Sequence, residues 1–242
     1  PEAVEIIERL ADTAKGKPKV RAKYYSAAAK IYRDKLQDLE AATGMYEKAL
    51  DEDWTNLGEF AALDKMLTES REYQLQERAY RHMLGRVSGK ERPELEAQLW
   101  HALGEIYRSR LKQLKEASEA FSVASRLEPD NVERHVILAE LFEALGNSDA
   151  ALNEHKSLLR LMPDRAESLS AMREICSATE RYDQAFCIVS NLAALGRASQ
   201  PELEFFEQWI PRPMANPTGL LGDEDWLRHL RHPDEEPYIS GI

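Results

Sequence analysis

Cysteine is nearly absent from the sequence, with two residues among 242, and eleven glycines and eleven prolines give no compositional extreme. These numbers exclude a disulfide-stapled domain and a collagen-like chain, because both need a strongly biased composition. No apolar run approaches the ~20 residues that cross a bilayer, and the N-terminus lacks the layout of a signal peptide. We therefore expect a chain in a reducing compartment, the cytoplasm, with no direct insertion into a membrane.

Positive charge is also in short supply. The 32 Lys and Arg residues stand against 43 Asp and Glu residues, which gives a net charge of −11. A chain of this charge repels the phosphates of nucleic acids and anionic lipids. The charge balance therefore predicts that the partner is not a nucleic acid.

Strand signals are missing too, since no alternating run of β-branched residues is followed by Asn-Gly or Asp-Gly. Residues 1–200 are instead rich in Ala, Leu, Glu, Lys and Arg, with few helix breakers. These residue types have high helix propensity. The sequence therefore predicts an all-α fold.

An internal repeat organises these helices. Pro129 and Pro163 are 34 residues apart, and an Asp follows each of them. Upstream of Pro129 the bulky and small residues fall at helical spacing, in the order Trp100, Leu103, Gly104, Tyr107, Ala117, Phe121 and Ala124. A glycine within a helix costs about 1 kcal/mol relative to alanine, so Gly104 indicates a close approach by a neighbouring helix.

This pattern resembles the tetratricopeptide repeat family, whose signature has the same residues at the same spacing. The resemblance implies a solenoid of antiparallel helix pairs that stack into a right-handed superhelix, with a capping helix and an irregular tail at the C-terminus. It also implies that the first helix of each pair lines a concave groove.

Carrying the register along the chain predicts five repeats, of which the second is weak because Asp64 and Gln76 replace small residues. The first and third repeats share one extra residue, after Tyr32 and Tyr107. The segment 89–96 extends either a loop or the following helix. The predicted segments are a second helix of a truncated repeat at 1–21, repeats at 22–56, 57–88, 97–131, 132–165 and 166–199, a capping helix at 200–210, and an acidic tail with a short helix at 211–242.

The unpaired helix at residues 2–15 suggests a fragment of a larger protein. The tail sequence from Trp226 to Pro233 loosely resembles large bacterial multi-repeat proteins. Its apolar residues are expected to cover a partner or to dock onto the array in cis.

Candidate chemical sites in the sequence have simpler structural interpretations. The register gives His135 and His155 packing positions, and the pair His229 and His232 has too few partners for the usual four-coordinate zinc site. Cys176 and Cys187 fall on facing helices and are expected to be a reduced, buried pair. No catalytic motif is present. We expect no enzymatic activity, no metal and no cofactor.

The expected groove has charged residues at most of its positions. Its N-terminal half is basic and its C-terminal half is acidic, with a small apolar step between them; the alternative is a solvated face whose charges have no role in recognition. Lys30, Ala62 and Glu105 depart from the clamp that some family members use to hold the C-terminal carboxylate of chaperones. The candidate groove residues are Lys23, Lys30, Arg33, Lys65, His101, Glu105, Arg108, Glu133, Val136, Ile137, Glu140, Glu143, Glu167 and Glu174.

Three functions fit this sequence. The first is a scaffold that binds a protein or peptide partner through the groove. The second is an architectural spacer in a larger protein, and the third is a regulatory arm of an enzyme that lies outside this chain. The sequence favours the scaffold, because a curved array of repeats offers an extended binding surface.

Overall fold

A computed structural model describes residues 2–209 of the chain. All regular elements in this range are helical, and none of its helices is long and apolar enough to cross a membrane. The chain divides into one unit at residues 1–197 and a second at 198–242. The helices of the first unit are α1 (Glu2–Thr13), α2 (Pro18–Ile31), α3 (Leu39–Glu52), α4 (Leu57–Glu69), α5 (Tyr73–Val87), α6 (Pro93–Glu105), α7 (Leu114–Leu127), α8 (Val132–Ala144), α9 (Ser148–Leu161), α10 (Ala166–Ala178) and α11 (Tyr182–Ala194).

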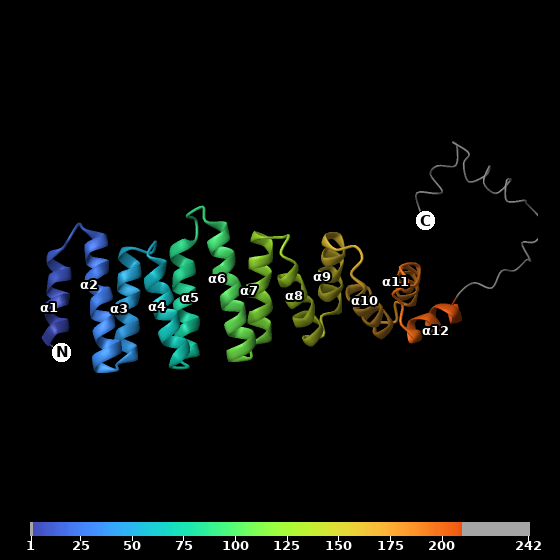
Figure 1. The fold of residues 1–242 in the computed structure, drawn as a ribbon, viewed down its shortest axis with the longest axis horizontal. Coiled ribbons are helices and arrows are strands. Elements are labelled where there is room, and N and C mark those ends of the chain that lie inside the picture. Colours follow the sequence, from blue (N-terminus) through green and yellow to red (C-terminus); the bar gives the residue numbers. More distant parts are fainter. Residues whose placement is uncertain (1, 210–242) are drawn as a thin grey trace, which may run out of the picture. The chain divides into compact units, whose positions relative to one another are not determined.

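Each of these helices packs against the next one in the chain, as Figure 1 shows. Within this unit α2 pairs with α3, α4 with α5, α6 with α7, α8 with α9, and α10 with α11. Each pair falls within or close to one predicted repeat, so we keep the division into five repeats as our proposal. Pro93 begins α6, which shows that residues 93–96 extend the following helix rather than the loop.

Local sequence signals set the helix ends. Pro18 and Pro93 occupy the first position of their helices, where the missing backbone N–H costs nothing. Asp38, Asn131 and Asn147 cap α3, α8 and α9, because each side-chain oxygen accepts a hydrogen bond from a backbone N–H three residues later. The caps of α3 and α9 set the start of the second helix of a pair, and the cap of α8 sets the start of the next pair.

The extra residue of the first and third repeats forms a wider helical turn. A π-helical turn follows α2 at Tyr32–Leu36 (η1) and another follows α6 at Ile106–Leu111 (η2). Both end in a left-handed residue, Gln37 at φ 52° and Lys112 at φ 58°. A π-turn absorbs one inserted residue without breaking the helix. The insertion seen in the sequence is therefore a local bulge, and the pairing of the helices is kept.

The core runs between the paired helices. Tyr46, Phe121, Leu63 and Leu103 are at most 1% exposed, and alanines at the helix contacts let the backbones approach closely. A Cβ atom added at Gly104 would lie 2.8 Å from the Phe121 ring, so the predicted close approach is confirmed. Trp100 and Phe142 pack against this core but stay partly exposed.

The described part of the second unit is the helix α12 (Gln200–Trp209). Ser199 precedes it, and the Glu202 carboxylate accepts hydrogen bonds from the Ser199 backbone N–H and hydroxyl, both at 2.7 Å. This is half of a capping box. The predicted short helix at 223–231, the histidine pair and the tail at 211–242 lie outside the described residues.

Candidate functional site

Side-chain contacts divide the first unit into two faces. Lys30 of α2 lies 3.5 Å from Glu59 of α4, and Arg134 of α8 donates a 3.4 Å hydrogen bond to His101 of α6. Successive first helices are therefore neighbours. We call the surface formed by α2, α4, α6, α8 and α10 the first-helix face.

The second helices are joined in the same way. Arg86 of α5 pairs with Glu47 and Asp51 of α3, and Arg181, just before α11, lies 2.7 Å from Asp149 of α9. We call the surface of α3, α5, α7, α9 and α11 the second-helix face.

The basic end of the first-helix face is shorter than the sequence predicts. Together α2 and η1 carry six Lys and Arg residues against one Asp, whereas α4 carries three acidic residues against Lys65. Lys65 lies on this acidic helix, 3.8 Å from Glu69. The predicted basic half therefore ends at η1.

Acidic neighbours also reduce the basic charge of α2 and η1. Lys30 pairs with Glu59, and Arg33 lies 2.6 Å from Asp34 and donates a hydrogen bond to the Tyr46 hydroxyl at 3.2 Å. Lys23 of α2 is exposed. Of the two predicted basic residues on α2, Lys30 is paired with Glu59, so Lys23 is the better placed to pair with a partner.

A pocket of about 400 Å³ lies between α4, α5, α6 and η2, and we call it the α4–α6 pocket. The predicted residues His101 and Glu105 line it. Burial, followed by the nearby Arg134 guanidinium, lowers the pKa of His101, which favours a neutral ring. Arg108 lies 2.9 Å from Glu105 and 3.9 Å from Glu140, so it links the third repeat to α8.

The polar departures of the second repeat form the wall of this pocket. Gln76 is 6% exposed and donates hydrogen bonds to Asp64 at 2.7 Å and to Thr68 at 2.8 Å. Burial and the nearby Asp64 carboxylate raise the pKa of Tyr80, which keeps its hydroxyl protonated as a hydrogen-bond donor. Sequence reasoning noticed Asp64 and Gln76 as departures but did not predict that they bond to each other.

A second pocket, of about 200 Å³, lies between α8, α9 and α10, and we call it the α8–α10 pocket. Four predicted groove residues line it, namely Val136, Glu140, Glu143 and Glu167. Glu143 accepts a 2.8 Å hydrogen bond from Nε2 of His155, which is 7% exposed. Sequence reasoning did not single out Arg165 and Ser168, which also line this pocket.

The remaining groove candidates differ in accessibility. Glu133 is exposed, and Glu174 is exposed beside Arg173 at 3.3 Å. Ile137 is 7% exposed and belongs to the hydrophobic core, which corrects its assignment to the groove. The apolar step therefore consists of Val136 alone.

Two other sequence interpretations can be compared with the structure. His135 is buried, and its ring nitrogens lie 2.6 Å from the Glu154 carboxylate and 2.8 Å from the Pro129 carbonyl, in line with a packing position. Cys176 and Cys187 line one pocket of about 350 Å³ between α9, α10 and α11. Cys187 is exposed, which corrects the expectation of a buried pair, while burial raises the pKa of Cys176.

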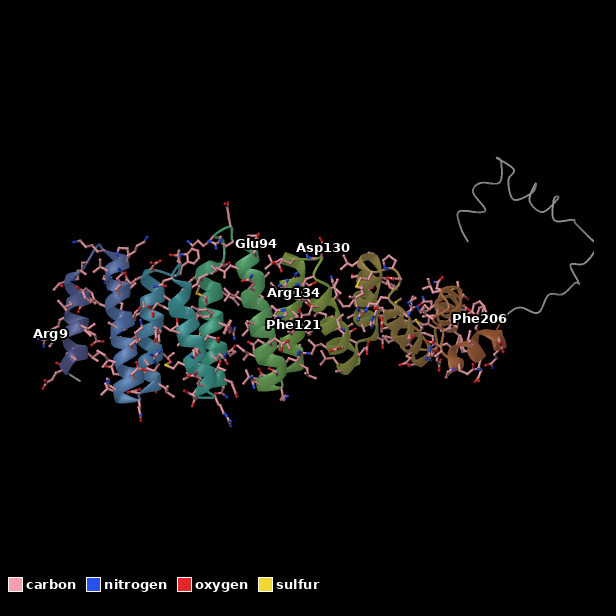
Figure 2. The ribbon with its side chains drawn as sticks, in the orientation of Figure 1. Arg9, Glu94, Phe121, Asp130, Arg134 and Phe206 are labelled. Carbon is pink, nitrogen blue, oxygen red and sulfur yellow. The ribbon has the colours of Figure 1, made fainter. Side chains whose placement is uncertain are left out.

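Among residues 2–209 there is no group of three or more His, Cys, Asp or Glu side chains placed to hold a metal ion. Arg134, labelled with Phe121 in Figure 2, is buried and bonded within the protein, to Glu128 at 2.6 Å and to the Ala124 carbonyl at 3.1 Å. The Arg134 guanidinium thus joins α8 to the C-terminal end of α7.

The helix pairs and their 34-residue repeat define a helical-repeat solenoid, and within that class the chain has the tetratricopeptide repeat fold. No family model matches the chain, and no curated protein matches it in sequence.

Solved structures of similar fold include YrrB, a TPR protein with an unusual peptide-binding site, at 18% identity, covering 85% of this chain and 97% of that one with a TM-score of 0.46. MamA matches at 17% identity, 80% and 99% coverage and a TM-score of 0.47. PilF of Pseudomonas aeruginosa matches at 18% identity, 86% and 98% coverage and a TM-score of 0.41.

Proposed function

We propose that this chain is a protein-interaction scaffold that binds an extended segment of a partner protein along the first-helix face. One observation carries the proposal: the α4–α6 and α8–α10 pockets both lie between successive first helices, and both are lined by charged side chains. Pockets that recur along one face of a repeat array suit a partner whose side chains enter at intervals.

The charges on this face suggest the orientation of the partner. Acidic groups of the partner would lie near α2 and η1, and basic groups would lie along α8 and α10, where Glu133, Glu140, Glu143, Glu167 and Glu174 outnumber the two arginines of these helices. Charge complementarity of this kind mainly sets the association rate and the orientation of the complex.

The test begins with peptides selected from a random library on the full chain. We expect the double variant Lys23→Glu with Lys35→Glu, which changes one exposed lysine on α2 and one on η1, to slow the association of acidic peptides and to reduce its salt dependence, as measured by surface-based kinetics at two salt concentrations. Lys30 is left unchanged because reversing its charge would place a second carboxylate beside Glu59 and add a change in stability to the change in binding.

The matched control is Lys48→Glu with Lys115→Glu. Both lysines are exposed and lie on α3 and α7 of the second-helix face, so the net charge change is the same. An equal loss of association rate in both double variants would contradict binding on the first-helix face. A chain that selects no peptide at all would favour the architectural spacer.

A further inference from the structure

Three residues of the α8–α10 pocket depart from the pattern of the preceding repeats. His155 stands where the third repeat has Phe121, which is fully buried. Arg165 stands at the end of the fourth repeat, where the third repeat has Asn131; its side chain makes no cap for α10, although Asn131 caps α8. The first departure replaces an apolar packing residue by a polar one, and the second replaces a capping side chain by one that makes no cap.

Ser168 is a third such departure. It lies 34 residues after Arg134 and is likewise the third residue of its helix. Arg134 is long enough to reach the Ala124 carbonyl and the Glu128 carboxylate. Ser168 is 1% exposed, and its buried hydroxyl has no hydrogen-bond partner within residues 2–209.

Each of the three residues presents a buried polar atom that lacks a partner among the described residues. These atoms are Nδ1 of His155, Nε of Arg165 and Oγ of Ser168, and all three residues line the same 200 Å³ pocket. A buried polar atom without a hydrogen bond costs about 1 to 3 kcal/mol. Three such atoms in one pocket therefore make it a place where a polar ligand would gain hydrogen bonds.

The three atoms have different hydrogen-bonding roles. Nε2 of His155 lies 2.8 Å from a carboxylate oxygen of Glu143, which only accepts, so Nε2 is the donor and Nδ1 is an acceptor whenever the ring carries one hydrogen. Nε of Arg165 can only donate, and the Ser168 hydroxyl can do either. A carboxamide matches this set, because its NH₂ group donates and its carbonyl accepts. A carboxylate would leave Nδ1 without a donor, and an ammonium would leave Nε without an acceptor.

The size and the rim of the pocket agree with a side chain as the ligand. Its volume of about 200 Å³ far exceeds the ~30 Å³ share of one water molecule in liquid water. Val136 and Leu158 supply apolar walls for a methylene stem. The exposed Glu140, Glu143 and Glu167 line the same pocket and would attract basic residues on either side of the carboxamide.

We propose that the α8–α10 pocket binds the side-chain carboxamide of a glutamine or asparagine that is flanked by basic residues in the partner segment. This inference rests on the proposed function, since it names the residue that the first-helix face selects.

The test uses three peptides, Ac-Lys-Gln-Lys-NHCH₃ and its versions with Met or Glu at the centre, whose N-methylamide end carries no primary carboxamide. Methionine has nearly the shape of glutamine but no amide, and glutamate lacks the donor. With the full chain labelled with ¹⁵N-histidine, we expect the glutamine peptide to shift the Nδ1 resonance of His155 and to bind about fivefold more tightly than the other two. The His155→Phe spectrum assigns the resonance.

The variant Ser168→Ala is expected to reduce the preference for glutamine over methionine. Its control is Ser118→Ala, because Ser118 is also buried but donates to the Lys115 carbonyl. Thermal unfolding of both variants verifies that each one folds.

Each outcome decides between the proposals. Equal binding of the three peptides, or no shift of the His155 resonance at any concentration, overturns the carboxamide pocket and indicates that water satisfies the three atoms. A different result contradicts the proposed function: charge reversal on the first-helix face that leaves the association rate of the selected peptides unchanged.

Discussion

At the scale of single residues, Gly104 shows how closely the helices of the third repeat approach each other. A methyl group at this position would overlap the ring of Phe121. This ring is fully buried, so it could shift only by displacing its neighbours in the core. The cost of that overlap exceeds the gain in helix propensity from alanine, since overpacking a core costs roughly 1 to 3 kcal/mol.

We expect Gly104→Ala to lower the free energy of unfolding by about 1 to 2 kcal/mol, and Phe121→Ala to lower it by about 3 to 5 kcal/mol. Gly44→Ala is the control, because nothing lies within 4 Å of its added Cβ, and it should raise stability by about 0.5 to 1 kcal/mol. Urea unfolding measures all three. A stabilising Gly104→Ala would show that the helices are further apart than described.

His101 gives a second prediction for a single residue. Its pKa in the folded chain lies below the ordinary value of about 6.5, chiefly because of burial. The unfolded chain therefore takes up the proton first, so this contribution to stability is present above about pH 6.5 and is lost as the pH falls towards the folded pKa.

We expect the unfolding temperature of the wild type to fall more than that of His101→Gln between about pH 8 and pH 5.5. The comparison with the variant removes the contribution of the carboxylates, which titrate in both proteins. Parallel curves for the two proteins would contradict the lowered pKa of His101.

At the scale of the elements, the turn within each helix pair ends in a left-handed residue. The positions are Arg71 after α4, Gly146 after α8 and Glu180 after α10, with φ between 58° and 70°. In each of them the next backbone N–H bonds five residues back, as in Glu72 to the Leu67 carbonyl at 3.0 Å, which is the Schellman motif. Only Gly146 adopts this φ without strain from a Cβ atom.

We expect Arg71→Gly and Glu180→Gly each to stabilise the array by about 1 kcal/mol, because glycine removes the strain of the left-handed conformation. Gly146→Ala should destabilise it by a similar amount. Thermal unfolding is the measurement, and Arg71→Ala is the control that changes the side chain but keeps the Cβ atom. Equal stability of Arg71→Gly and Arg71→Ala would show that the strain is absent.

The elements also show which features can be predicted from sequence. Helical spacing and the 34-residue period predict the helix pairs, because the formation of each pair depends on local helix propensity and on one buried stripe per helix. The pockets depend on how side chains of neighbouring repeats meet. Asp64 and Gln76 illustrate this, since the pattern marks both as departures but only the structure shows the 2.7 Å bond between them.

The misassigned Ile137 has the same cause. It is adjacent to Val136 in the sequence, but residues one apart on a helix point in directions about 100° apart, so one faces the pocket and the other the core. The buried Ser168 hydroxyl was missed because serine is usually exposed, and a repeat register gives no information about unsatisfied polar atoms.

At the scale of the whole first unit, stability depends on contacts between neighbours. Each helix from α1 to α11 packs against the helix before or after it, so the loss of one repeat removes a packing surface from the repeats on either side. The energetics of such an array follow a sum of repeat and interface contributions. The effect of a core substitution should therefore decrease with distance along the array.

Hydrogen exchange of Phe121→Ala tests this dependence. Phe121 lies on α7, and its ring contacts His101 of α6 at a centroid distance of 5.2 Å. We expect amide protection to fall most in α6 and α7, less in α5 and α8, and least in α2 and α3, because each interface passes on only part of the destabilisation. Uniform loss of protection from α2 to α11 would instead indicate that these helices unfold as one cooperative unit. In such a unit, a ligand in the α8–α10 pocket would raise the protection of α2 as much as that of α9.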